Sequence, residues 1–403
     1  MNILALLAAS AAAAVPQQAP VPADDPKPII VTAKRLDATE KALKDCIARG
    51  CPPDQEIDAA LAHAENLFVY GEYFDARRTL MTTIGHVDKR AKDYPEAVGD
   101  IWRAQSRIAA HMGEREDTRM SQFKSLDALR SGMDNSDSRV FGQRIAVADT
   151  LAREGRVDLA TNAFRDIASD ARKKNQPLAQ GTALLRVALI QASLYEMQPV
   201  AFGRELNRAI DALLATTDPV PAVYRDAARL LRARLAIKPG DTAAIDRLVA
   251  DYAPPGANRP ILLYQPPLPD EQPAPRTLDG RPGQARANAS FEGQWADVAF
   301  RIRPDGRVED VDVARESKAL DRSWIEPMLA SIAGRRYAPM TLRPGNPSLR
   351  RVERYTLTAY WEVPTATRLR QRGYPRIEML DLSNDVASQS PAPTGIVGST
   401  PAN

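Results

Sequence analysis

The sequence predicts a multidomain chain in which an all-α solenoid of helical hairpins precedes a small α+β domain. Two observations lead to this fold class. From Asp37 to about Ala253 the apolar residues fall at helical spacing. After a proline-rich stretch the apolar period changes to two, which is typical of strands. We divide the chain into residues 1–15, 16–36, 37–253, 254–290, 291–382 and 383–403.

The composition argues against several classes of function. The 54 Lys and Arg against 51 Asp and Glu give a net charge of +3, far from the excess of a dedicated nucleic-acid-binding protein. Three His and two Cys supply few metal ligands, and no phosphate-binding, dinucleotide-binding or nucleophile motif stands in a suitable context. We therefore expect no enzyme, no catalytic residue, no metal and no cofactor.

The amino end predicts export. Ile3 to Val15 is an apolar run with the length of a signal-peptide core, and it is too short to cross a bilayer. Ala12 and Ala14 offer an A-x-A cleavage point, so residues 1–15 form a predicted signal peptide. Two alternatives stay open: an apolar helical start of a cytosolic chain, and an uncleaved anchor.

Cys46 and Cys51 are the only cysteines of the chain, and Gly50 and Pro52 break any helix that would join them. In an oxidising compartment the two are expected to form a disulfide. Their spacing is not C-x-x-C, so a redox pair is a remote alternative, and two inert thiols are another.

Residues 37–253 are expected to form about five helical hairpins. Gly71, Gly113 and Gly155 recur at a constant spacing, and further breaks fall at residues 197–199 and 239–241. A glycine ends one helix in the left-handed conformation and lets the next start at once. Because a single hairpin cannot bury its apolar stripe alone, the hairpins should stack into a curved array. One such stripe consists of Ile57, Leu61, Ala64 and Phe68.

Two of these breaks, within Leu67–Ala76 and Leu151–Ala160, resemble the G-x-[Y/V]-x-x-A turn of tetratricopeptide repeats. The spacing of the glycines is longer than the repeat of that family, which indicates a lengthened relative. The resemblance implies a concave face that binds peptides or proteins, and a helical spacer without a ligand is the alternative. His63, His86 and His111 lie on different predicted helices, at spacings unlike those of a zinc site.

Prolines are concentrated between Pro254 and Pro282, which predicts an extended, semi-rigid linker. Its apolar island, Ile261 to Tyr264, is the one part expected to dock on a neighbouring domain. At the other end, the Ser/Pro/Gly-rich residues after Ser383 have too little apolar content to fold.

Residues 291–382 predict a β-β-α-β domain. Two strands flank the turn Pro304-Asp305-Gly306, a helix covers about 321–333, and a final strand runs over 352–363. Arg376 to Leu382 could add a further strand. Three strands under one helix leave a usable sheet edge.

Three stretches of this domain resemble the carboxyl-terminal domain of TonB, a periplasmic energy-coupling protein. They are Val298–Val308 with its Asp-Gly turn, Val311–Ser317, and Arg335–Pro339 after the helix. The resemblance implies a periplasmic binding domain that accepts an extended peptide by β-strand addition next to its last strand. The residues expected to bind the partner strand are Arg354, Tyr355, Leu357, Ala359 and Trp361.

Two further surfaces are candidates for binding. Ile29, Ile30, Val31, Thr32 and Ala33 resemble the TonB box of outer-membrane receptors, and the alternative is a short apolar stretch within a flexible segment, residues 16–36. A local excess of arginine predicts a basic patch for lipopolysaccharide phosphates, peptidoglycan carboxylates or an acidic protein; the alternative is a solvated face. The patch comprises Arg335, Arg336, Arg350, Arg351, Arg370 and Arg372.

We therefore expect an exported, non-enzymatic protein-binding protein of the periplasm. Its partner would be a cell-envelope protein, such as an outer-membrane transporter or a TonB-type domain, with peripheral association with the envelope and without nucleic acid. The alternatives are a TonB-type energy transducer and an unrecognised periplasmic enzyme. The sequence does not predict the oligomeric state.

Overall fold

The structure is a computed structural model that describes residues 35–238, 241–252, 260–266, 293–318, 320–342, 348–362 and 370–383. The predicted signal peptide, the TonB-box-like segment Ile29–Ala33 and most of the predicted disordered tail lie outside these ranges. Among the described helices, none has both the length and the apolar character needed to cross a membrane.

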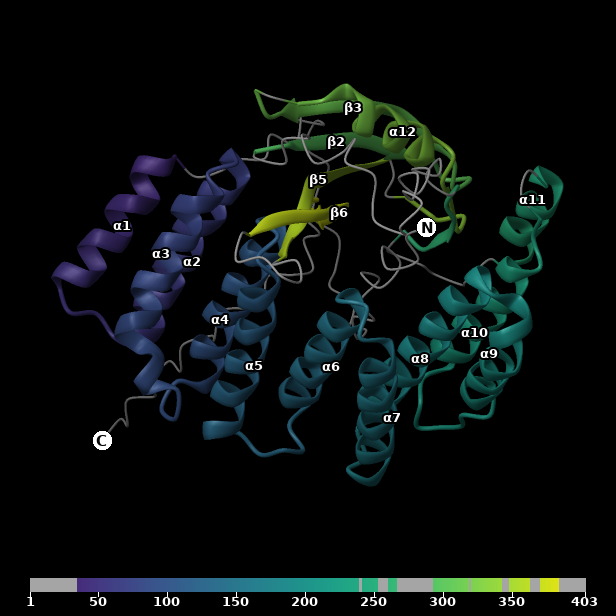
Figure 1. Cartoon of the computed structure of the whole chain (residues 1–403), viewed down its shortest axis with the longest axis horizontal. Helices are drawn as coiled ribbons and strands as arrows, with labels where there is room; N and C mark the ends of the chain where they lie inside the picture. The colour runs from purple at the N-terminus through teal and green to yellow at the C-terminus, as the bar shows by residue number, and fades with distance from the viewer. Residues whose placement is uncertain are drawn as a thin grey trace, which may run out of the picture.

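The described chain is mostly helical and ends in a small antiparallel sheet, as the sequence predicted in general class (Figure 1). Within the described ranges, eleven α-helices precede the first strand, and consecutive helices from α1 to α10 pack side by side along a curved row. They are α1 (Leu36–Ala48), α2 (Pro53–Tyr70), α3 (Tyr73–Val87), α4 (Pro95–His111), α5 (Arg115–Gly132), α6 (Ser138–Arg153), α7 (Val157–Lys173), α8 (Pro177–Met197), α9 (Pro199–Leu214), α10 (Ala222–Leu235) and α11 (Thr242–Asp251).

The predicted breaks fall between helices. Gly71, Gly113 and Gly155 have φ angles of +86°, +75° and +79°, which is the left-handed conformation that ends α2, α4 and α6. α8 ends at Met197 and α9 starts at Pro199, where the absent amide of proline costs no helical hydrogen bond. We call the α2–α3, α4–α5 and α6–α7 connections the first, second and third glycine turns.

The carboxyl-terminal part contains β2 (Trp295–Ile302), β3 (Val308–Glu316), α12 (Arg322–Ala333), β4 (Arg336–Tyr337), β5 (Leu349–Glu362) and β6 (Gln371–Asp381). The main sheet is antiparallel, with strand order β3-β2-β5-β6. The island in the predicted linker is strand β1 (Leu262–Tyr264), which pairs with β4 in a separate two-stranded sheet. The linker region thus contributes a strand next to the domain.

Local signals explain the hairpin and the helix. Gly306 has a φ of +80° and donates its amide to Arg303 O, while Asp305 accepts a hydrogen bond from the Arg307 amide, so the Asp-Gly turn joins β2 to β3. Asp321 caps α12 by accepting from the Ser323 amide. Alternate residues of β2 then pack against the apolar side of α12, as Phe300 and Ile325 show.

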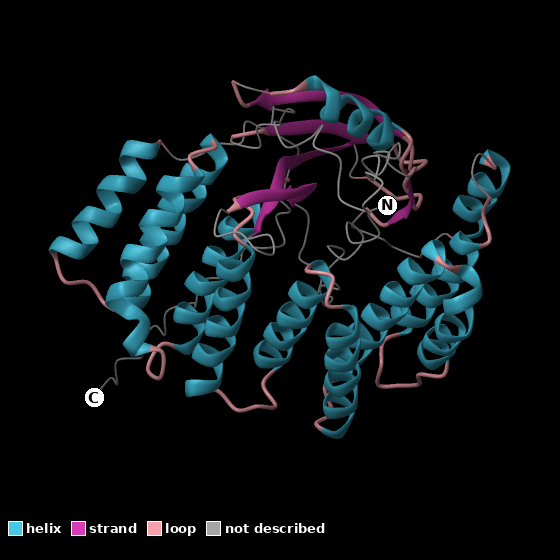
Figure 2. Ribbon diagram, in the orientation of Figure 1, coloured by secondary structure: helices cyan, strands magenta, loops and turns pink. Residues whose placement is uncertain are grey.

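The helical row and the carboxyl-terminal part each bury apolar clusters. The helices bury two large apolar clusters, one along α6–α10 and one along α1–α4, and the domain buries a third between α12 and the sheet. The strands lie on the inner side of the helical row (Figure 2). Trp295 of β2 belongs to the cluster of α1–α4, and Leu380 of β6 packs against it, so the sheet and the array share part of a core.

Candidate protein-interaction surface

One arginine of the sheet binds the carbonyls at the first glycine turn. Arg354 of β5 is 0% exposed, and its guanidinium donates to Phe68 O and Val69 O at 2.7 Å each, the carbonyls at the end of α2. It also pairs with the buried carboxylate of Asp297 and stacks 3.9 Å from the centre of the Trp295 ring. The last carbonyls of a helix lack intrahelical donors, so the guanidinium supplies a donor to Val69 O and a second one to Phe68 O, which also accepts the Gly71 amide.

A polar and aromatic cluster surrounds this anchor. The Thr356 hydroxyl lies 3.0 Å from the Tyr73 hydroxyl and 2.9 Å from His111 Nδ1. Phe68 stacks on Tyr73 and meets His111 edge to face. Burial of the imidazole, together with nearby cations of which Arg354 is the first, lowers the pKa of His111 to about 3. His111 is therefore neutral at ordinary pH.

The second glycine turn is also contacted by an arginine that stacks on a tryptophan, but at a different carbonyl. Arg372 of β6 donates to Met112 O at 2.9 Å and stacks 4.1 Å from the Trp361 ring centre. The Trp361 amide donates to Gly113 O at 3.2 Å, and Arg370 pairs with Glu114 at 3.0 Å. The helix-end carbonyls of the array thus bind arginines of the sheet at two successive turns.

The close approach at Gly113 gives a testable contrast. A Cβ atom at Gly113 would overlap the Ala359 carbonyl, whereas one at Gly155 would meet no described atom within 4 Å. We expect Gly113→Ala to lower the free energy of unfolding by about 3 kcal/mol, and Gly155→Ala by only about 1 kcal/mol for the left-handed backbone. Chemical denaturation measures both. Equal losses of unfolding free energy in the two variants would mean that the sheet does not approach Gly113 closely enough to exclude a Cβ atom.

The expected partner-binding strand is not an edge. Arg354, Tyr355, Leu357, Ala359 and Trp361 all lie on β5, which pairs with β2 on one side and with β6 on the other. That prediction was wrong because β6 covers the edge, and because Arg354 is used to hold the array. Ile377 and Met379, which pack against the α12 core, were the sequence signal for a full strand.

The outer edge of the sheet at this end belongs to β6. The Leu382 amide donates to Val352 O at 2.8 Å, which is one of the two bonds of a hydrogen-bonded pair in an antiparallel ladder; the Val352 amide donates to the Ser383 hydroxyl instead. Because such pairs alternate along an antiparallel ladder, Arg376, Glu378 and Leu380 direct their backbone groups toward β5. The groups of the residues between them point away from β5.

These outward residues are Pro375, Ile377, Met379 and Asp381, and among the described residues no other strand pairs with them. Proline has no amide hydrogen, so a sheet tolerates Pro375 where the amide would face away from the ladder. Its position therefore agrees with an edge. Within the described ranges, the outer side of Ile377, Met379 and Asp381 therefore presents carbonyls and amides that no strand pairs with.

The opposite edge, β3, carries features that discourage pairing. The β2–β3 ladder has two register shifts, and Asp310 has a φ of +52° next to one of them. Glu309, Asp310 and Asp312 place acidic side chains along the strand. Bulges and charges at an edge oppose the addition of another strand. Of the two edges, β6 is the better acceptor.

Most arginines of the predicted basic patch make contacts within the chain. Arg335 is 4% exposed and donates to Glu353 at 2.9 Å and to the Tyr355 hydroxyl at 2.8 Å. Arg351 pairs with Asp381, and Arg336 donates to backbone carbonyls. Arg370 and Arg372 hold the second glycine turn, and Arg350 lies opposite Arg301 in the β2–β5 ladder. A count of arginines does not reveal such partners, and the binding of an acidic partner to this patch stays a prediction.

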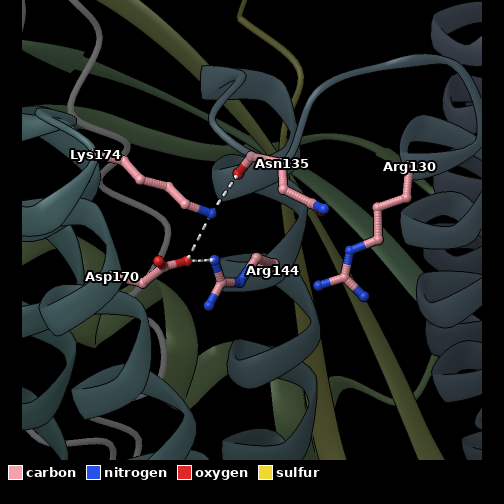
Figure 3. A pocket seen from close by; sticks show the side chains of 5 residues that line it. All are labelled: Arg130, Asn135, Arg144, Asp170 and Lys174. Atoms are coloured by element: carbon pink, nitrogen blue, oxygen red, sulfur yellow. Dashed lines mark hydrogen bonds and ion pairs between the residues drawn. The ribbon is translucent and has the colours of Figure 1, made fainter.

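Two polar pockets lie away from the sheet. One of about 370 Å³ is lined by Arg130, Asn135, Arg144, Asp170 and Lys174 (Figure 3). Asp170 accepts from Arg144 at 2.5 Å and from Lys174 at 3.4 Å, and the Arg144 hydrogen bond lowers the pKa of Asp170. The other, of about 600 Å³, is lined by α7, α8, α9 and the residues that follow α9. Neither lining contains a histidine or a cysteine.

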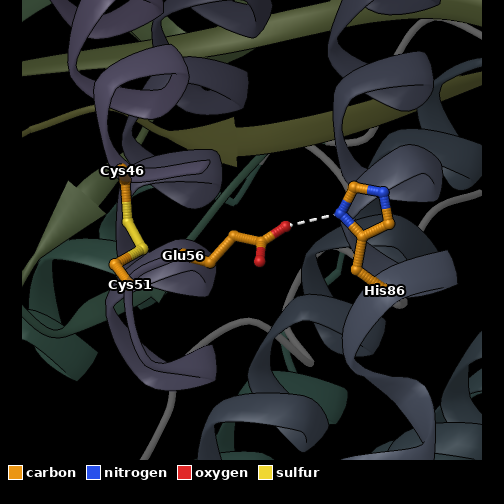
Figure 4. Close-up of a disulfide and its surroundings, with 4 residues drawn as sticks. All are labelled: Cys46, Cys51, Glu56 and His86. Carbon is orange, nitrogen blue, oxygen red and sulfur yellow. Dashed lines mark hydrogen bonds and ion pairs between the residues drawn. A yellow bond between two sulfur atoms is a disulfide. The ribbon is translucent and has the colours of Figure 1, made fainter. Parts of the chain in front are cut away.

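The two cysteines and two of the histidines make local contacts at the amino end of the helical row. Cys46 and Cys51 form the predicted disulfide between α1 and α2, and Glu56 beside it lies 2.7 Å from His86 of α3 (Figure 4). His63 Nδ1 lies 3.0 Å from the Thr39 hydroxyl. Within the described ranges, no three His, Cys, Asp or Glu side chains gather in a way that could hold a metal ion.

No protein-family model matches the chain, and no curated protein resembles it closely enough to count as a relative.

Proposed function

We propose that this chain is an exported protein-binding protein whose sheet accepts an extended peptide by β-strand addition, on a scaffold of helical repeats. The observation that carries the proposal is the place of β6 at the end of the strand order β3-β2-β5-β6, where no other strand of the described chain pairs with its outer side. An extended peptide gains affinity from main-chain hydrogen bonds and specificity from alternate side chains. β6 offers such bonds next to a rigid, well-packed sheet.

The TonB-like assignment of the domain is supported by its element order. An Asp-Gly hairpin, a helix, and a long strand follow one another, and Arg335 to Pro339 follow the helix as in the resemblance. The chain departs from the resemblance in one respect: β6 lies beside β5, where the peptide was expected. We therefore assign the binding edge to β6 instead of β5.

The repeat-like array is supported by its turns. Ala76 and Ala160, the small residues of the two matching motifs, are fully buried where consecutive helices approach. Export is supported by the disulfide, because disulfides persist mainly in oxidising compartments such as the periplasm. We propose a partner in the cell envelope that presents an extended segment similar to Pro28–Lys34.

Strand addition can be tested with a synthetic peptide of the sequence of residues 28–34. Met379→Pro removes an outward amide of β6 without removing a β5–β6 hydrogen bond, so we expect it to weaken binding of this peptide at least tenfold. Pro375→Ala adds an outward amide and should bind the peptide as tightly as the wild type or more tightly. Fluorescence anisotropy of the labelled peptide measures both affinities.

Thermal melting of each variant separates weak binding from misfolding. If the wild-type chain does not bind the peptide, or if a folded Met379→Pro variant binds it unchanged, β6 is not the acceptor edge.

A further inference from the structure

The three glycine turns are geometrically equivalent. In each, the glycine amide donates to the carbonyl three residues earlier, and the next amide donates to the carbonyl five residues before it. At the first turn these acceptors are Phe68 O and Leu67 O, and at the third they are Ala152 O and Leu151 O. The φ angles of the three glycines all lie between +75° and +86°. The turns therefore present the same backbone surface.

The first two turns bind the same kind of group. In both, a guanidinium stacked on a tryptophan ring donates to carbonyls at the end of a helix, but the carbonyls differ. Arg354 on Trp295 donates to the carbonyls three and two residues before Gly71, and Arg372 on Trp361 donates to the one directly before Gly113 and to Ala359 O of β5. The planar fork of a guanidinium suits two neighbouring carbonyl acceptors better than a lysine ammonium does. The chain itself thus shows which chemistry these turns select.

The third turn is open in the described part of the chain. Ala152 O and Arg153 O hold the same places relative to Gly155 as Phe68 O and Val69 O hold relative to Gly71. No described atom lies within 4 Å of the position that a Cβ of Gly155 would take, whereas Trp295 and Ala359 crowd Gly71 and Gly113. Among the described residues, the acceptors that bind arginine at the first turn have no such ligand at the third.

The sheet ends next to this turn. Trp295 of β2 covers the first turn, and residues of β5 and β6 cover the second. Arg376 of β6 lies within electrostatic range of the third turn, where Glu154 attracts it and Arg153 repels it. From one turn to the next along the array, the contacting strand therefore changes from β2 to β5 and β6, which is the direction of the outer edge of the sheet. A strand added outside β6 would be the next one to meet the array.

We propose that the third glycine turn is a binding site for an arginine side chain carried by an extended segment of a partner protein that adds to the outer edge of β6. This inference rests on the proposed strand addition and specifies the partner further. The arginine would donate to Ala152 O and Arg153 O, as Arg354 does to Phe68 O and Val69 O. The new interface would continue the one between the sheet and the array.

The charges around the turn allow a further cation. Glu154 already pairs with two arginines, Arg119 at 2.9 Å and Arg156 at 3.4 Å. Arg376 pairs with Glu378, and Arg153 donates to the Thr150 hydroxyl at 3.3 Å. The Glu154 carboxylate is nearly buried, and its Oε1 has no hydrogen-bond partner among the described residues. The nearby cations thus have partners, and one carboxylate oxygen still lacks one within the described ranges.

The test uses the peptide of residues 28–34 and two versions with arginine, Val31→Arg and Thr32→Arg. Adjacent side chains of a strand point to opposite faces, so one of the two arginines faces the array in any register. We expect one version to bind the wild-type chain about tenfold more tightly than the parent peptide. Glutamate at the same position should give no gain.

Gly155→Asn fills the turn, because asparagine tolerates the left-handed conformation and adds a side chain. Gly50→Asn is the matched control: Gly50 has a φ of +61° and open space, and it lies in the connection between α1 and α2. We expect the arginine gain to vanish in Gly155→Asn and to persist in Gly50→Asn. The inference is overturned if the arginine peptide still binds more tightly than the parent peptide in both Gly155→Asn and Gly50→Asn. It is also overturned if glutamate at the same peptide position increases affinity more than arginine does. If the parent peptide itself does not bind, the proposed strand addition fails instead.

Discussion

Arg354→Met is expected to lower the free energy of unfolding by about 3–5 kcal/mol, the largest effect of any single substitution that we predict. Arg354 and Asp297 are both fully buried, so the substitution leaves a carboxylate without its closest partner. Arg315 also contacts Asp297, at 2.6 Å, but its side chain is 36% exposed and cannot replace the buried guanidinium. Val69 O loses the donor that Arg354 supplies, while Phe68 O keeps the Gly71 amide as its donor.

Urea unfolding monitored by tryptophan fluorescence measures this loss, because Trp295 stacks on Arg354 and packs into the α1–α4 cluster. The control is the double variant Arg354→Leu with Asp297→Leu, which removes both charges. We expect it to recover part of the stability, because an apolar pair often replaces a buried ion pair at little cost. A single variant within about 0.5 kcal/mol of the wild type would show that Arg354 does not hold the sheet to the array.

Acid should weaken the same interface through His111. Its pKa is about 3 in the folded chain and 6.5 for an unperturbed histidine, so between these values the unfolded chain binds a proton that the folded chain does not. The stabilising contribution of neutral His111 is complete above pH 6.5 and is lost as the pH falls toward 3. The loss is about 1.4 kcal/mol per pH unit, or about 5 kcal/mol over the whole interval.

The comparison with His111→Gln isolates this contribution, since glutamine keeps a polar partner for Thr356 but does not titrate. Carboxyl groups such as Asp149, whose pKa burial raises, act in the opposite direction in both proteins. We expect the stability difference between wild type and variant to shrink as the pH falls below 6.5. A difference that is independent of pH would contradict the buried, neutral state of His111.

The sequence predicts those parts of the fold that local chemistry determines. Gly71, Gly113 and Gly155 end helices because few residues other than glycine adopt positive φ at low cost, and this property is visible in the sequence. The turn at Asp305 and Gly306 and the cap at Asp321 are equally local. These signals located the hairpin, α12 and most helix ends.

The candidate site depends on contacts between distant residues, and it was therefore predicted poorly. Arg354 binds the carbonyl of Phe68, which lies in the first part of the chain, and no period or motif marks that contact. Whether β5 is central or at an edge depends on β6, in which Gly373 and Pro375 weaken the strand pattern. The sequence shows the third glycine turn as part of a repeat. Only the structure shows that described residues crowd Gly71 and Gly113 but not Gly155.

Amide hydrogen exchange along β6 tests the central claim most directly. If β6 is the open edge of the sheet, the amides of Arg376, Glu378 and Leu380 exchange slowly because they donate to β5, and those of Ile377 and Met379 exchange fast. Site-resolved exchange in the full chain therefore should show an alternating pattern. Uniformly slow exchange at all five amides would mean that another segment covers this edge, and it would contradict the proposed acceptor strand.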